Sequence, residues 1–248
     1  MCYSRSVGRF FKVLPSAYQD ILLYPVLKFL AFSTIVYGAV KLRNLNTSYL
    51  FPRKRYNGRI WCFFVITVSL YLLERITTDI IDLLSTNAKD FIKSKETRFY
   101  GFQSRGVRHF FSLVIIGPIM EEILFRGLIL RSFLMRYSVK NSIILSSLLF
   151  ASLHVLSPDK YFFSTFIFSF LFAAFIAWVV LKTENIKIAI ACHMFWNFTN
   201  YILLPFIFMT LGVRATTMTD VIVIFLGMSS FSFVLLYIGL IRMKRDLI

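Results

Sequence analysis

The sequence predicts an all-α protein, a polytopic bundle of transmembrane helices with about seven spans, six to eight. Hydrophobic residues make up 58% of the 248 residues, against roughly 45–50% in soluble domains. The mean hydropathy is +0.71. Because the chain has no repeat at a fixed period and no second soluble domain, we expect one membrane domain over residues 1–248.

The expected helices follow from apolar runs, since a span needs about 20 mostly apolar residues. These runs cover residues 21–42, 60–84, 109–135, 142–156, 162–181, 186–209 and 221–241. The first run is longer than the core of a cleaved signal peptide, which has roughly 7–15 residues. We therefore interpret it as an uncleaved span or signal anchor. The fourth run is short for a full crossing, so it either begins with Lys140 at the interface or lies partly inside the bundle.

The charge distribution predicts the orientation of the chain. A net charge of +16 on a soluble protein would suggest nucleic acid, but the basic residues lie mostly between the apolar runs. We therefore expect contact with membrane lipid and no nucleic-acid partner. The basic residues that flank the later loops on one side are Arg131, Arg136, Lys140, Lys182, Lys187, Arg242, Lys244 and Arg245. The intervening loops hold only Lys160 and Arg214, which predicts a cytoplasmic C-terminus; the basic loops at 43–59 and 89–108 leave the N-terminal half open.

Charges inside an apolar run are the first sign of a functional site. The stretch PIMEEILFRGLIL places Glu121, Glu122 and Arg126 inside the third run. A buried charge without a partner is costly, and ionisable residues within a membrane segment indicate function. Glu122 and Arg126 are four residues apart, so on a helix they share a face and can pair. Glu121 is rotated by about 100° from that pair, which leaves its carboxylate for chemistry.

Two of the three histidines lie in other apolar runs. On the fourth run Phe150 and His154 are one helical turn apart, and on the sixth His193 and Asn197 have the same spacing. A single such histidine is more often a hydrogen-bonding partner for a neighbouring helix. Two histidines, an asparagine and the charged Glu-Glu-x-x-x-Arg motif on three helices are better explained by one shared polar site.

These motifs resemble those of a known family of intramembrane proteases. In this order, they are similar to the three signature motifs of the CPBP family, the CAAX prenyl protease and bacteriocin-processing proteases also called the Abi family. The matching residues are Glu121-Glu122-x-x-x-Arg126, Phe150-x-x-x-His154 and His193-x-x-x-Asn197. The resemblance implies a CAAX-protease-like bundle in which residues 109–209 form the catalytic core helices.

The resemblance also implies a role for each residue. Glu121 would be the general base that activates water, and His154 would share the water and shuttle its proton. His193 and Asn197 would donate hydrogen bonds to the oxyanion. The residues with a supporting role would be Glu122, Arg126 and Phe150.

A metal is the open alternative for this chemistry. Glu121, His154 and His193 would meet the preference of zinc for three protein ligands plus water. However, the chain has no H-E-x-x-H helix, and the family is understood as glutamate-dependent and metal-free. We therefore expect no cofactor, with zinc on these three residues as the alternative.

The sequence thus predicts an intramembrane endopeptidase that cleaves a hydrophobic or lipid-anchored peptide or protein substrate. Two alternatives remain open. One is a small proton-linked transporter in which the glutamates and histidines form a relay. The other is a non-proteolytic bacteriocin-immunity or regulatory protein with the same fold. The compact size favours a bacterial cytoplasmic membrane, where bacteriocin precursors and leader peptides are candidate substrates.

Overall fold

The computed structural model describes part of the chain. The described residues are 30, 33, 34, 37, 38, 41, 56, 58–85, 110–155, 161–203 and 218–245. The expected first span at 21–42 is therefore described at only a few positions. The polar connection between the second and third runs lies outside the described residues, as do the loops at 156–160 and 204–217.

The described stretches are almost entirely helical. In chain order they are α5 (Trp61–Ser85), η2 (Phe110–Ile116), α8 (Gly117–Glu122), η3 (Ile123–Ile129), α9 (Leu130–Leu134), α10 (Val139–His154), α11 (Phe162–Thr183), α12 (Ile186–Phe198), η4 (Thr199–Leu203) and α14 (Met218–Arg245). The elements labelled η are π-helices. No β-strand occurs in this part of the chain, so the all-α prediction is confirmed.

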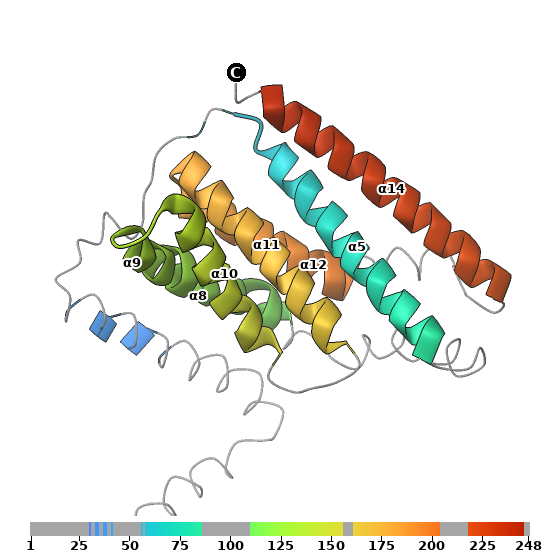
Figure 1. The fold of residues 1–248 in the computed structure, drawn as a ribbon, viewed down its shortest axis with the longest axis horizontal. Coiled ribbons are helices and arrows are strands. Elements are labelled where there is room, and N and C mark those ends of the chain that lie inside the picture. Colours follow the sequence, from blue (N-terminus) through green and yellow to red (C-terminus); the bar gives the residue numbers. More distant parts are fainter. Residues whose placement is uncertain are drawn as a thin grey trace, which may run out of the picture.

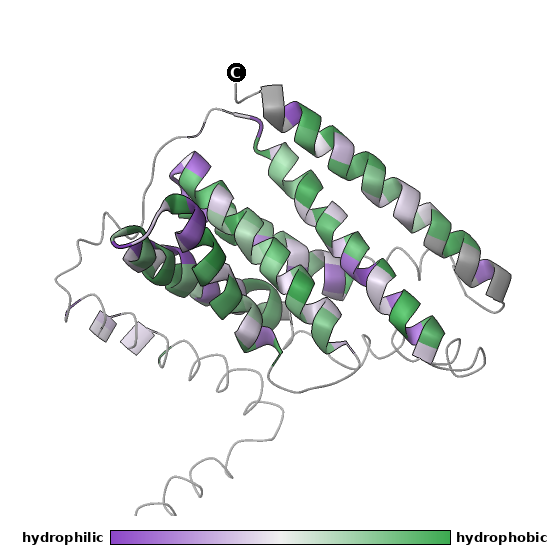
Figure 2. Ribbon diagram, viewed as in Figure 1, coloured by the Kyte–Doolittle hydropathy of each residue, from purple (hydrophilic) through white to green (hydrophobic). Residues whose placement is uncertain are grey.

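One described helix meets the length and composition of a membrane span. Helix α11 is the one described helix that is long and apolar enough to cross a membrane, while α10 and the segment Leu226–Arg242 are apolar but shorter. Figure 2 shows the hydrophobic length of α11. The prediction of about seven spans is therefore not established. One reason is that the second half of α5 carries charged side chains, and another is that π segments divide the third run into short pieces.

The helices pack as antiparallel pairs. Helices α5 and α14 lie side by side (Figure 1), and the Ser232 hydroxyl donates to the Ser69 carbonyl over 2.9 Å. Gly239 allows this approach, because a Cβ added there would lie 2.7 Å from the Cγ1 atom of Ile66. Helices α10 and α11 form a second antiparallel pair on the other side of the bundle (Figure 1).

Local sequence explains where two helices begin. Ser138 precedes α10, and its hydroxyl accepts a hydrogen bond from the Asn141 backbone N–H over 3.4 Å. Asn185 precedes α12 and accepts from the Lys187 N–H over 3.0 Å. Glu184 ends α11 in the left-handed region, with a φ of 49°. This conformation reverses the chain within two residues, as left-handed caps do, so α12 folds back directly against α11.

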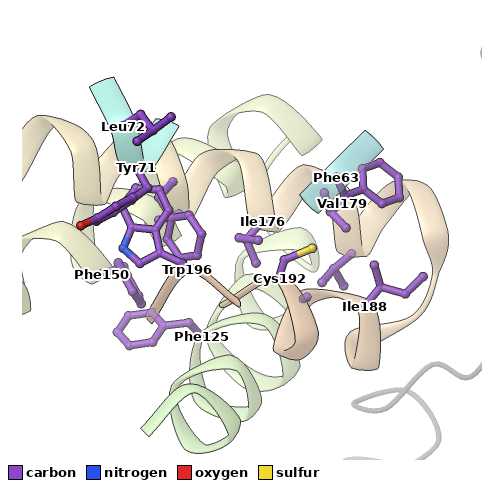
Figure 3. Close-up of a cluster of buried hydrophobic side chains, with 14 residues drawn as sticks. Phe63, Tyr71, Leu72, Phe125, Phe150, Ile176, Val179, Ile188, Cys192 and Trp196 are labelled. Atoms are coloured by element: carbon purple, nitrogen blue, oxygen red, sulfur yellow. The ribbon is translucent and has the colours of Figure 1, made fainter. Parts of the chain in front are cut away.

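The core lies between α5, α11 and α12, with one aromatic residue each from η3 and α10 (Figure 3). Its aromatic members are Phe63, Tyr71, Phe125, Phe150, Phe172 and Trp196. Trp196 packs against Phe172 at a ring separation of 4.4 Å and against Tyr71 at 5.7 Å. The Tyr71 hydroxyl also donates to the Asn200 side chain over 3.0 Å. These contacts fix α12 between α5 and α11, and α12 carries His193.

Candidate active site

Glu121 and Glu122 end a short α-helix that lies between two π-helices. Helix α8 begins with Gly117 and Pro118 and is preceded by η2 and followed by η3. π-Helical bulges are uncommon and occur frequently at functional sites. Proline has no backbone N–H, so the π pattern of η2, in which a carbonyl bonds the N–H five residues later, cannot continue past Leu113.

Asn197 donates a hydrogen bond to a backbone carbonyl next to this break. The π-type partner of the Leu113 carbonyl would be the N–H of residue 118, and residue 118 is proline. The Asn197 Nδ2 atom donates to the Leu113 carbonyl over 2.7 Å. A buried carbonyl without a partner is costly, so this hydrogen bond ties α12 to the helix that carries both glutamates. An amide nitrogen has two hydrogens, which leaves one for another acceptor.

Glu122 and Arg126 form a buried ion pair. Their side chains are 0% and 1% exposed, and the Arg126 Nε atom lies 3.1 Å from Glu122 Oε2, an ion contact rather than a well-aligned hydrogen bond. The Arg126 Nη2 atom donates to the Ala173 carbonyl of α11 over 3.1 Å. The guanidinium also lies 4.8 Å from the centre of the Phe150 ring. Through these contacts the pair joins η3 to α11 and α10.

His193 connects the two glutamates. Its Nδ1 atom lies 2.8 Å from Glu122 Oε1, and its Nε2 atom lies 3.8 Å from Glu121 Oε2. The side chain is 5% exposed. The rings of Phe172 and Phe150 contact it edge-on at 5.1 and 6.0 Å. The imidazole is therefore held in one orientation by packing and by the Glu122 carboxylate.

His154 approaches Glu121 from the other side. It is the last residue of α10, where its Nδ1 atom lies 2.8 Å from the Phe150 carbonyl and its ring stacks on the Phe150 ring at 4.2 Å. The Nε2 atom lies 3.8 Å from Glu121 Oε2. The side chains of Glu121 and His154 are 33% and 36% exposed. This side of the site is accessible, whereas the Glu122 side is closed.

The structure thus brings three of the predicted residues together. The Nε2 atoms of His154 on α10 and His193 on α12 both face the Oε2 atom of Glu121 on α8. The pairing of Glu122 with Arg126 occurs as the four-residue spacing predicts. Sequence reasoning missed that Glu122 also binds His193, and it missed the residues that support the site through ring or backbone contacts. These are Leu113, Phe172 and Ala173. The position of Pro118, five residues after Leu113, was the one signal in the sequence that could have indicated the Asn197 contact.

The alternative zinc ligands lie in this same cluster, with both histidine Nε2 atoms 3.8 Å from Glu121 Oε2. Within the described stretches, no group of three or more His, Cys, Asp or Glu side chains has an arrangement that could hold a metal ion.

Comparison with known families finds one match, over part of the chain. Residues 104–199 match the family model described as type II CAAX prenyl endopeptidase Rce1-like. The chain therefore carries an Rce1-like domain of the CPBP family over these residues, as the three motifs predict. Members of this family are integral membrane proteases, which agrees with the apolar helix α11 and supports a peptidase activity. No curated protein and no solved structure matches the chain.

We predict that Arg126→Met lowers the free energy of unfolding by about 3–5 kcal/mol, because it leaves the Glu122 carboxylate buried without its cation. The double variant Glu122→Gln/Arg126→Met should recover part of this loss, since no buried charge then remains. Thermal unfolding of the purified proteins in detergent measures both. An Arg126→Met protein as stable as wild type would show that the pair does not hold the helices together.

We also predict that the cost of Asn197→Ala depends on residue 118. In the wild-type background the substitution removes the side-chain donor of the Leu113 carbonyl and should cost about 1–3 kcal/mol. In a Pro118→Ala background the cost should be smaller, because residue 118 then has its own N–H. A double-mutant cycle of unfolding free energies measures this coupling. Equal costs in the two backgrounds would contradict the assignment.

Proposed function

We propose that this chain is an intramembrane endopeptidase that hydrolyses a peptide bond of a hydrophobic or membrane-associated substrate with water activated by Glu121. One observation carries the proposal. The Oε2 atom of Glu121 lies 3.8 Å from the Nε2 atoms of both His154 and His193. These separations are too long for direct hydrogen bonds and suit groups that act on a shared molecule. The Rce1-like domain over residues 104–199 supports the same activity.

The hydrogen bonds at the Nδ1 atoms indicate which imidazole atoms are free to react. A backbone carbonyl only accepts, so the Nδ1 atom of His154 donates to the Phe150 carbonyl. The Nδ1 atom of His193 likewise donates to the Glu122 carboxylate. In its neutral form each ring then has a lone pair on Nε2, directed at Glu121. A water molecule that reached these acceptors could donate one hydrogen to Glu121 and the other to an imidazole.

His193 lies between both carboxylates of the site, with its Nδ1 atom toward Glu122 and its Nε2 atom toward Glu121. A protonated His193 can donate from Nε2 to the oxyanion, and Asn197 can donate with the amide hydrogen that does not bind η2.

The proposed reaction accounts for both protons of the water. The water oxygen attacks the carbonyl carbon while Glu121 takes one proton. His193 and Asn197 stabilise the resulting oxyanion. The C–N bond then breaks as Glu121 returns its proton to the leaving amine. The second proton leaves the new carboxylic acid and passes to His154, which is the more exposed of the two histidines.

The setting of this activity is part of the proposal. Residues 1–248 would form one membrane domain, with the catalytic helices at 109–209, in a bacterial cytoplasmic membrane with the C-terminus on the cytoplasmic side. The basic residues that flank the later apolar runs support this orientation. Bacteriocin precursors, leader peptides and prenylated tails are the candidate substrates.

We predict that Glu121→Gln reduces peptide cleavage at least about 100-fold, the usual effect of removing a general base. The folded structure should persist, because Glu121 is one-third exposed and makes only 3.8 Å contacts to the histidines. Purified protein in lipid vesicles can be assayed with a farnesylated CAAX peptide and with unprenylated hydrophobic peptides. Glu184→Gln is the matched control, since Glu184 is exposed and lies at the end of α11. Cleavage by Glu121→Gln at the wild-type rate would rule out the proposed mechanism.

We also predict that a tight chelator leaves the cleavage rate unchanged, because Glu121 and the histidines activate water without a Lewis acid in this mechanism. The rate is measured before and after dialysis against the chelator. Loss of activity that added zinc restores would instead assign Glu121, His154 and His193 as metal ligands.

A further inference from the structure

Two asparagines near the end of α12 bond different neighbouring helices. Asn197 lies in the last turn of α12, and its Nδ2 atom donates to the Leu113 carbonyl of η2 over 2.7 Å. Asn200 follows in η4, and its Oδ1 atom accepts a hydrogen bond from the Tyr71 hydroxyl of α5 over 3.0 Å. The end of α12 is therefore held by two partners, the helix that precedes the glutamates and α5.

A change of helix geometry lies between the two asparagines. Residues three apart on an α-helix share a face, so a continuous α-helix would direct Asn200 to the same neighbour as Asn197. Instead the α-helix ends at Phe198, and the π-helix η4 begins at Thr199. Such π segments occur frequently at functional sites. With this segment in place, Asn197 bonds η2 while Asn200 bonds α5.

Tyr71 also reaches the site through aromatic rings. It is 2% exposed, and its ring meets the Trp196 ring edge-on at 5.7 Å (Figure 3). The Trp196 ring contacts Phe172 at 4.4 Å, and Phe172 meets the His193 ring edge-on at 5.1 Å. One buried tyrosine is thus connected to both proposed oxyanion donors, to Asn197 along the helix from Asn200 and to His193 through two rings.

The hydrogen bond between Tyr71 and Asn200 lies outside the segment that matches the family model. That segment covers residues 104–199, whereas α5 precedes it and Asn200 follows it by one residue. The proposed catalytic residues all lie within it. The contact of α5 with the end of α12 is therefore a feature of the folded chain that the family match does not supply.

We propose that Tyr71 is a positioning residue for the cleavage reaction. Its hydroxyl holds Asn200 and thereby fixes the end of α12, so that Asn197 directs its second amide hydrogen at the oxyanion. This inference rests on the proposed function. Oxyanion donors act mainly on the charge that develops in the transition state. Loss of the Tyr71 hydroxyl therefore lowers kcat and leaves KM nearly unchanged.

The variant Tyr71→Phe tests this role, because it removes the hydroxyl and keeps the ring that packs on Trp196. In lipid vesicles, with a peptide that the wild type cleaves, kcat should fall about 3–10-fold, the rate equivalent of one net hydrogen bond. KM should stay within about twofold. Tyr237→Phe is the matched control with wild-type kcat expected, since Tyr237 is exposed on α14. Asn200→Ala should lower kcat as Tyr71→Phe does, and the double variant no further.

A kinetic double-mutant cycle shows whether Tyr71 acts through Asn197. In an Asn197→Ala background, Tyr71→Phe should have no further effect on kcat, because the donor that it aligns is gone. Independent losses in the two backgrounds would overturn the proposal. So would a wild-type kcat in Tyr71→Phe, or a higher KM with kcat unchanged, which would indicate a contact with bound substrate. If Tyr71→Phe does not fold, Asn200→Ala is carried through the same cycle.

A spectroscopic measurement separates this proposal from the proposed function, because it needs no catalysis. In protein labelled with ¹⁵N at the asparagine side chains, the Asn197 amide signals are those missing from Asn197→Asp. Tyr71→Phe should shift these signals, whereas Tyr237→Phe should not. Unchanged Asn197 signals in Tyr71→Phe would overturn the positioning role even if Glu121→Gln abolishes cleavage. Shifted signals together with wild-type cleavage by Glu121→Gln would instead reject the proposed mechanism and keep the contact of Tyr71 with the end of α12.

Discussion

The buried ion pair between Glu122 and Arg126 is the interaction on which the site depends. A charge excluded from water must be compensated by close partners, and here Arg126 comes from the next turn of the same helix while Ala173 and His193 come from α11 and α12. Arg126 forms an ion pair with Glu122 and also donates a hydrogen bond to the Ala173 carbonyl. Glu122 in turn holds the His193 ring through its contact with Nδ1. Because all of these atoms are buried, moving one helix would leave several polar groups unpaired. The pair therefore sets the distance between the helices that carry Glu121 and His193.

A second constraint comes from a proline and acts through a distant residue. Pro118 has no N–H to offer the Leu113 carbonyl in the π pattern of η2, and Asn197 bonds that carbonyl from α12. Phe150 has a comparable role among the rings, since it stacks on His154 and also contacts Arg126 and the edge of His193. Asn197 and Phe150 thus help to hold Glu121, His154 and His193 in the positions that the proposed reaction needs.

Much of the fold was predictable because it depends on local composition. In the described residues, helices occur on the expected apolar runs from residue 60 onward and the all-α class is confirmed, and residues 104–199 match the Rce1-like family model. The count of about seven spans stays a prediction, because the first run is described at only a few positions, the third run contains π segments and α5 carries Asp79 and Asp82 near its end. The contacts of the site with the Leu113 and Ala173 carbonyls and with the Phe172 ring were also not predictable. Every residue has a backbone carbonyl and many residues here are aromatic, so only the folded structure determines which of them lie near the site.

The sequence by itself determined which residues could share a helix face, because the helical repeat places Glu122 one turn from Arg126 and Phe150 one turn from His154. It also determined that these charges lie in apolar surroundings and resemble a protease family. Only the tertiary structure decided that both imidazoles meet the same oxygen of Glu121 and that Glu122 binds His193. Those contacts join α8, α10 and α12, and their distances depend on how three helices pack around Phe150 and Phe172 rather than on any spacing along the chain.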